Sequence, residues 1–322
     1  MLFTLGGTIA MAGHDGGGVV ARLPGDELVA EIDGLAGIDI EIRDVQALPS
    51  AALSFEDVLQ VVELAEDAVA DGAVGVVLTQ GTDTLEETAF LIDSVWTLDA
   101  PFAVTGAMRN PTLAGADGPA NMTAAVAVAA AAHAASRGAL VVFNDEIHAA
   151  RYVRKTHTSS PSTFASPDLG PIGHVVEGRP RFLADLPARR AVIGVSRPTL
   201  ATTRVGLYVA ALDDDGGLLL SGGRGQDGIV VAGFGVGHVP PDLAPVLGEL
   251  AERMPVVLTS RAGSGSVFAA TYGAVGSERD LLRRGLLSGG FLHPYQARVL
   301  LRLLLAAGAD RAEIAAAFAE FG

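Results

Sequence analysis

The stretch GVVLTQGTDTLEETAFLIDSVWTL, residues 75–98, decides the fold class. It begins with an apolar run at residues 75–79, turns at Gly81, and continues through Thr82 and Asp83 into a helical pattern at residues 85–98. A short continuous apolar run that ends in a glycine turn is typical of a buried parallel strand. The stretch therefore predicts a strand, a polar turn and a helix in succession.

The same unit recurs through the first 185 residues. Other apolar runs predict buried strands at residues 2–5, 102–105 and 139–143, and helical spacing predicts helices at residues 54–71 and 119–136. Ser54 opens the first of these helices with an S-x-x-D capping pattern, and Pro119 suits the first position of the second. Alternation of strands and helices predicts right-handed βαβ units, and hence an α/β fold.

The chain is long enough to favour two domains, because single cores stop growing at roughly 250–300 residues and it has 322. Residues 180–203 contain three prolines, several arginines and no clear periodicity, which is typical of a connection between domains. We therefore expect an N-terminal catalytic domain at 1–185, a linker at 186–204 and a smaller α/β domain at 205–322. Strand and helix patterns predict elements of the second domain at residues 205–211, 228–234, 249–254, 256–259, 296–307 and 311–321.

Composition excludes several classes of protein. The net charge of −15 disfavours a nucleic-acid partner, because a phosphate backbone would be repelled. The chain has no cysteine and its seven histidines are scattered without an H-x-x-x-H pair, so no metal site is expected. The longest apolar stretch is too short for a membrane span, and from the N-terminal residues we expect no signal peptide. We expect a soluble cytoplasmic enzyme.

Lysine usage is the most unusual feature of the composition. Of the 22 basic residues, 21 are arginine and one, Lys155, is lysine. Arginine replaces lysine at little cost on a surface, but it cannot replace an amine that must lose a proton. Chance survival of one lysine is the alternative. The functional interpretation is that Lys155 takes part in proton transfer.

Three segments combine residue types that can carry out nucleophilic and acid–base catalysis. They are LGGTIA at residues 5–10, LTQGTDTLEET at 78–88 and ARYVRKTHTSS at 150–160. A threonine hydroxyl becomes a nucleophile when a neighbouring base takes its proton, and glycines leave backbone amides free to face an oxyanion. A carboxylate can bind a substrate ammonium group, and a desolvated lysine can act as a base. Each segment alone also has a structural explanation: a glycine turn, a helix cap at Thr82 or Asp83, and a loop.

Together the segments resemble the bacterial-type L-asparaginase family. The similarity extends over most of the chain and includes TGAMRN and GADGPANM, VVFNDEIHAARYVRKTHT, TFASPDLGPIG and GGFLHPYQARVLL, within residues 105–122, 141–158, 163–173 and 289–301. The resemblance implies a larger, doubly wound N-terminal domain with a mostly parallel sheet and a smaller C-terminal α/β domain. It also implies a homotetramer built from dimers, with active sites completed by a neighbouring chain, and no cofactor or metal.

The resemblance also implies roles for individual residues. In the family, the threonine of GGTIA is the usual nucleophile, and a threonine, an aspartate and a lysine form a second triad. The matching catalytic residues here are Thr8, Thr82, Asp83 and Lys155. Besides Asp83, the substrate-binding residues implied are Ser50, the main chain at Ala107, and Glu278 from the partner chain.

The sequence departs from the family pattern at three places. Residues 11–22, which follow the first threonine, contain no tyrosine, Ala51 follows the substrate serine, and the turn GFGVGHVP at 233–240 lacks the usual asparagine. We therefore keep several alternatives beside L-asparagine hydrolysis. They are a preference for glutamine or a D-amino acid, a non-catalytic amino-acid sensor, the amidase subunit of a tRNA-dependent amidotransferase, and a nucleotide-binding protein.

Overall fold

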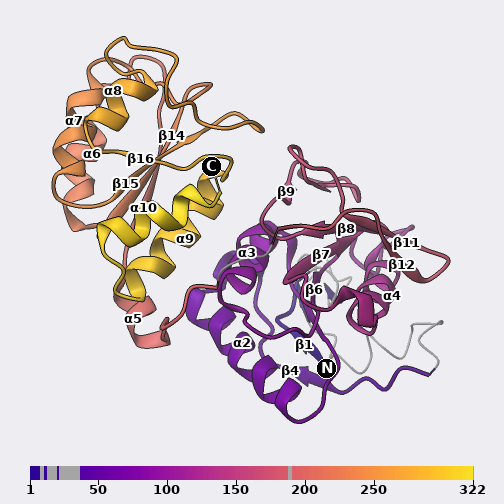
Figure 1. Cartoon of the computed structure of the whole chain (residues 1–322). Coiled ribbons are helices and arrows are strands. Elements are labelled where there is room, and N and C mark those ends of the chain that lie inside the picture. The colour runs from indigo at the N-terminus through magenta and orange to yellow at the C-terminus, as the bar shows by residue number, and fades with distance from the viewer. Residues whose placement is uncertain (8–10, 13–19, 22–36, 188–190, 322) are drawn as a thin grey trace. The chain divides into compact units, whose positions relative to one another are not determined.

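The computed structural model describes residues 1–7, 11–12, 20–21, 37–187 and 191–321. The chain forms two compact units, Met1–Ala191 and Val192–Gly322 (Figure 1). The first contains an eight-stranded sheet and the second a four-stranded sheet. The linker expected at residues 186–204 stays a prediction, although the division between the units falls within it.

The large sheet is mixed but mostly parallel. Its strand order is β12-β11-β8-β7-β6-β5-β1-β4, in which β4, β1, β5, β6 and β7 run parallel and the other three strands are each antiparallel to their neighbours. The strands are β1 (Leu2–Thr4), β4 (Ile42–Asp44), β5 (Val76–Thr79), β6 (Phe102–Thr105), β7 (Ala139–Phe143), β8 (Glu146–Ala149), β11 (Gly173–Val176) and β12 (Arg179–Phe182). Two short antiparallel strand pairs lie outside this sheet: β2 (Met11–Ala12) with β3 (Val20–Ala21), and β9 (Arg154–Lys155) with β10 (Phe164–Ala165).

Helices cover both faces of this sheet, so the unit is doubly wound as expected (Figure 1). On one face α4 (Gly118–Ala129) packs its alanines, valines and Met122 against alternate strand residues such as Val77, Ala103 and Leu140. On the other face α3 (Leu85–Val95) packs against β6 and β7, with α2 (Phe55–Ala70) beside it. The capping box predicted for α2 is confirmed, because the Ser54 hydroxyl accepts from the Asp57 N–H and the Asp57 carboxylate accepts from the Ser54 N–H.

The second unit is a three-layer α/β domain. Its parallel strands lie in the order β13 (Val205–Val209), β14 (Gly228–Gly233), β15 (Val256–Ser260) and β16 (Leu287–Ser288). Apolar residues of α7 (Leu243–Ala251) share a core cluster with residues of these strands. The other helices of this unit are α5 (Arg197–Thr202), α6 (Gly217–Gly222), α8 (Glu278–Arg283), α9 (Pro294–Ala306) and α10 (Arg311–Ala319). Short 3-10 turns occur at Gly223–Gly225 in this unit and at Ser50–Ala52, Thr82–Thr84 and Ala132–Ala134 in the first.

The structure adds two local details that the sequence did not indicate. The helix expected at 119–136 ends at Ala129, because Ala131 adopts an extended conformation and Ser136 a positive φ of 63°. An alanine-rich stretch carries no stop signal, so this end was not visible in the sequence. The region 180–203 also contains regular structure: β12 pairs with β11, and α5 begins after a capping box between Ser196 and Thr199. Pro180 fits into β12 because that strand lies at the sheet edge.

Candidate active site

The carboxyl ends of three neighbouring strands meet at one edge of the large sheet. Thr4 of β1 lies opposite Thr79 of β5, which lies opposite Thr105 of β6, so the three strands end level with one another. Strand β1 is flanked by β4 on one side and β5 on the other, so the strand order reverses there. In open α/β sheets, such a switch point is where ligands bind.

The glycines after β1 bring the first two motifs into contact. Gly7 has a φ of 92°, and a Cβ atom placed on it would lie 2.1 Å from the Gly81 nitrogen. Only glycine fits both this conformation and this approach. The described chain thus reaches the second motif at Gly7, and Thr8, the predicted nucleophile, lies outside the described residues.

The side chains of Thr82, Asp83 and Lys155 are in direct contact. The Lys155 Nζ donates to Thr82 Oγ1 at 3.0 Å and to Asp83 Oδ1 at 2.7 Å. The Lys155 side chain is 14% exposed, whereas that of Asp83 is 69% exposed. The alternative that Thr82 or Asp83 caps a helix is not what is observed, since no side-chain capping bond forms at Gly81 or Thr84, which begin the two helical turns.

The expected carboxylate-binding serine and the expected backbone at Ala107 also lie next to this cluster. The buried Ser50 hydroxyl accepts from the Asp83 N–H at 3.2 Å, and the Ser50 carbonyl accepts from the Thr84 hydroxyl at 3.1 Å. Ala107 is fully buried just beyond β6, and a Cβ on the preceding Gly106 would lie 3.4 Å from the Thr82 methyl group. The described edge therefore gathers Ser50, Thr82, Asp83, Ala107 and Lys155.

One ionisable residue in this region was missed by the sequence reasoning. Glu86, in the first turn of α3, is only 6% exposed, and its Oε2 accepts from the Lys155 backbone N–H at 3.2 Å. Burial raises the pKa of Glu86 to about 7, although the positive charge of Arg154 and the hydrogen bond from the Lys155 backbone oppose the shift. The available signal was a pair of adjacent acids, Glu86 and Glu87, within the second motif at the start of the helix.

Glu278 belongs to the second unit and is fully buried there. Its Oε1 accepts from the backbone N–H groups of Thr271 at 2.9 Å and Tyr272 at 2.6 Å, and its Oε2 lies 3.2 Å from His238 Nε2. Burial acts to raise the pKa of Glu278, but these hydrogen bonds outweigh it and lower the pKa below its usual value. In its own unit, Glu278 holds the turn at Thr271 and Tyr272.

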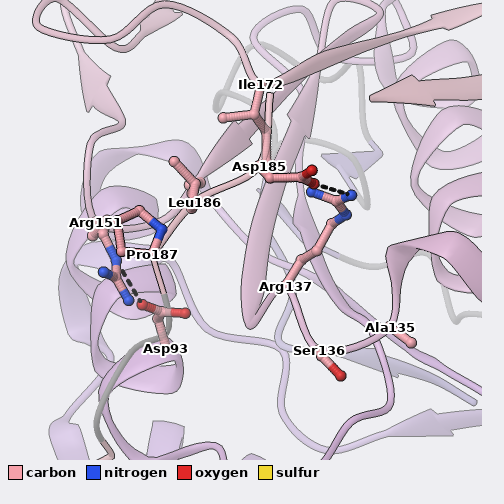
Figure 2. Close-up of a pocket in the computed structure, with 10 residues that line it drawn as sticks. Asp93, Ala135, Ser136, Arg137, Arg151, Ile172, Asp185, Leu186 and Pro187 are labelled. Carbon is pink, nitrogen blue, oxygen red and sulfur yellow. Dashed lines mark hydrogen bonds and ion pairs between the residues drawn. The ribbon is translucent and has the colours of Figure 1, made fainter. Parts of the chain in front are cut away.

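A separate cavity of about 290 Å³ is lined in part by Ser136 and Arg137, which directly precede β7 (Figure 2). Its charged side chains pair with one another: Arg137 binds Asp185 at 2.8 Å and Arg151 lies 3.7 Å from Asp93. Among the described residues, no group of three or more His, Asp or Glu side chains is arranged to hold a metal ion. No helix in the described part of the chain is both long and apolar enough to cross a membrane.

The fold and the site together define a two-domain α/β enzyme with a hydroxyl, a carboxylate and an amine in contact at a sheet switch point. Residues 1–188 match the model of the asparaginase N-terminal domain, and residues 204–318 match that of the glutaminase/asparaginase C-terminal domain. The chain therefore belongs to the asparaginase family and is an asparaginase-type amidohydrolase.

Similar proteins cover nearly the whole chain. An L-asparaginase from Bacillus licheniformis is 34% identical over 95% of this chain and 94% of its own length. A glutaminase-asparaginase from Pseudomonas fluorescens biotype A is 31% identical over 100% of this chain and 90% of its own. The crystal structure of a probable cytoplasmic L-asparaginase from Campylobacter jejuni superposes with a TM-score of 0.87 at 31% identity, covering 99% of this chain and 98% of the other.

Proposed function

We propose that this enzyme hydrolyses the side-chain amide of L-asparagine to L-aspartate and ammonia. The observation that carries the proposal is the contact of Lys155 Nζ with both Thr82 Oγ1 and Asp83 Oδ1 at the carboxyl edge of the sheet. A hydroxyl that contacts an amine can exchange a proton with it, and a pairing carboxylate holds the amine in place. Relatives named L-asparaginase support the choice of substrate.

In the proposed mechanism, Thr8 is the nucleophile. Its hydroxyl oxygen attacks the amide carbon, the proton of that hydroxyl passes to the leaving nitrogen, and ammonia departs to leave an ester on Thr8. Water then attacks the ester carbon, which releases the product acid and restores the Thr8 hydroxyl. Thr82 and Lys155 transfer protons in these steps, and backbone N–H groups at the glycine turn stabilise the oxyanion.

The remaining site residues bind the substrate's fixed groups. The exposed Asp83 carboxylate pairs with the substrate ammonium group, and Ser50 donates to its α-carboxylate. The backbone at Ala107 borders the side-chain amide. We also propose that Glu278 contributes from the partner chain by fixing the turn at Thr271 and Tyr272, because its own carboxylate is buried and hydrogen-bonded.

Glutamine is the second candidate substrate, because two Pseudomonas relatives are named glutaminase-asparaginase. Self-association to a dimer or tetramer and a cytoplasmic location are further proposals. The location is supported by the Campylobacter jejuni protein, titled probable cytoplasmic, whereas a Haemophilus influenzae relative is named periplasmic.

Ammonia release from L-asparagine, L-glutamine and their D-forms tests the proposal. Wild type should release ammonia fastest from L-asparagine, and Thr8→Ala should be nearly inactive while it still binds aspartate in calorimetry. Equal rates for the two proteins would rule out Thr8 as the nucleophile. Binding of an amino acid by wild type without any ammonia release would identify a sensor instead of an enzyme.

A further inference from the structure

Glu86 carries a buried carboxyl group that the proposed mechanism does not use. It lies one helical turn after Thr82 and accepts a hydrogen bond from the Lys155 backbone N–H. Lys155 is therefore held at both ends, with its Nζ bound to Thr82 and Asp83 and its backbone bound to Glu86. All three partners come from the continuous segment formed by the 3-10 turn and the start of α3.

A second contact ties residues 151–155 to α3, nearer the end of that helix. Arg151 lies 3.7 Å from Asp93 near the end of α3, and both side chains are largely buried, at 12% and 8% exposure (Figure 2). Residues 151–155 thus meet α3 at two carboxyl groups, Glu86 at the Lys155 backbone and Asp93 at the Arg151 side chain. The pair offers a matched comparison, because Glu86 and Asp93 are equally buried at 6% exposure of the whole residue.

Opposing influences act on the pKa of Glu86, and burial is the largest of them. Burial and the neighbouring Glu87 favour the neutral acid, whereas Arg154, Lys155 and the backbone N–H of Lys155 favour the carboxylate. The position in the first turn of α3 also favours the anion, through the helix dipole. Strands β6 and β7, which pack on α3, carry no ionisable side chain, and the ionisable residues of α2 are all acids.

We propose that Glu86 is the positioning residue of Lys155: its carboxylate holds the Lys155 backbone so that Nζ stays between Thr82 and Asp83, and protonation of Glu86 weakens that hold. A charged acceptor forms a stronger hydrogen bond than a neutral one, so the ionised form is the one that fixes the segment. The catalytic consequence rests on the proposed role of Lys155, but the hold itself does not.

The single lysine makes the hold directly observable. Protein grown with ¹⁵N-lysine as the only label gives one backbone amide signal, that of Lys155, which donates to Glu86. In wild type this signal should move with pH in one step centred at about 7, where Glu86 ionises. Glu86→Gln should abolish the step and Asp93→Asn should retain it. A step that survives in Glu86→Gln, or no step in wild type, would overturn the proposal.

Kinetics then connect the hold to catalysis. Glu86→Gln keeps an acceptor oxygen but no charge, so its kcat should lie between those of wild type and Glu86→Leu and should lose the step near pH 7. Glu86→Leu should lower kcat at least tenfold with KM nearly unchanged. Failure of Gln to rescue activity relative to Leu would refute the positioning role. An intact amide step in a wild type that releases no ammonia would refute the proposed function while supporting the hold.

Discussion

Replacement of Thr82 by valine removes the hydroxyl that contacts Lys155 and keeps the shape of the side chain. The lost hydrogen bond, 3.0 Å long, involves a charged group, and such bonds contribute about 1.5–3 kcal/mol to stability. Lys155 retains Asp83 at 2.7 Å, so its charge is not left unpaired, and we expect a loss of only about 1 kcal/mol in the free energy of unfolding. Loss of proton transfer should instead lower kcat/KM by about 10²–10⁴-fold.

The assay compares ammonia release with urea unfolding for Thr82→Val and for a matched control, Thr259→Val. Thr259 is also a buried threonine near the end of a parallel strand, but its hydroxyl donates to the Val231 carbonyl at 2.9 Å in the other unit. The control should lose a similar amount of stability and keep wild-type activity. The reasoning would be refuted if Thr82→Val stayed within about threefold of the wild-type kcat/KM, or if both variants lost activity equally.

Three further predictions concern stability. The folded-state pKa of Glu86 is raised from 4.5 to about 7, so ionised Glu86 destabilises the folded state by an amount that is absent below pH 4.5, grows up to pH 7 and reaches about 3 kcal/mol above it. In urea titrations, the stability of Glu86→Gln relative to wild type should therefore rise between pH 5 and pH 8. A difference that stays constant with pH would contradict this. Gly7→Ala should destabilise the first unit by at least about 3 kcal/mol, from a steric clash and a positive φ, and near-wild-type melting would show that the turn can adjust. Glu278→Ala leaves two backbone N–H groups without their acceptor and should cost the second unit about 2–4 kcal/mol, measured by hydrogen exchange in that unit, where unchanged protection would argue against the assigned contacts.

The sequence was sufficient for the α/β class and for most parallel strands, because these strands are short apolar runs bounded by glycine or polar turns. It was not sufficient for the antiparallel extension of the sheet, since β11 and β12 are short and mix apolar with charged residues. Their pairing depends on neighbours that only the folded sheet supplies.

The candidate site divides in the same way. Two motifs and a lone lysine indicated Thr82, Asp83 and Lys155. The lysine lies 73 residues after Thr82 and 72 residues after Asp83 in the sequence, yet contacts both. Glu86 escaped notice because its burial arises only in the folded unit, where strands and α2 pack on α3. The burial of Glu278 is likewise a tertiary property, and a motif match alone could not distinguish a substrate ligand from a carboxylate that binds its own backbone.

In the proposed mechanism the Lys155 amine transfers protons during amide hydrolysis. The most direct test is the initial rate of ammonia release from L-asparagine by wild type and by Lys155→Met, with circular dichroism to verify that both are folded. We predict an active wild type and a folded variant that is slower by at least about 10²-fold. A folded Lys155→Met enzyme that releases ammonia at the wild-type rate would contradict it.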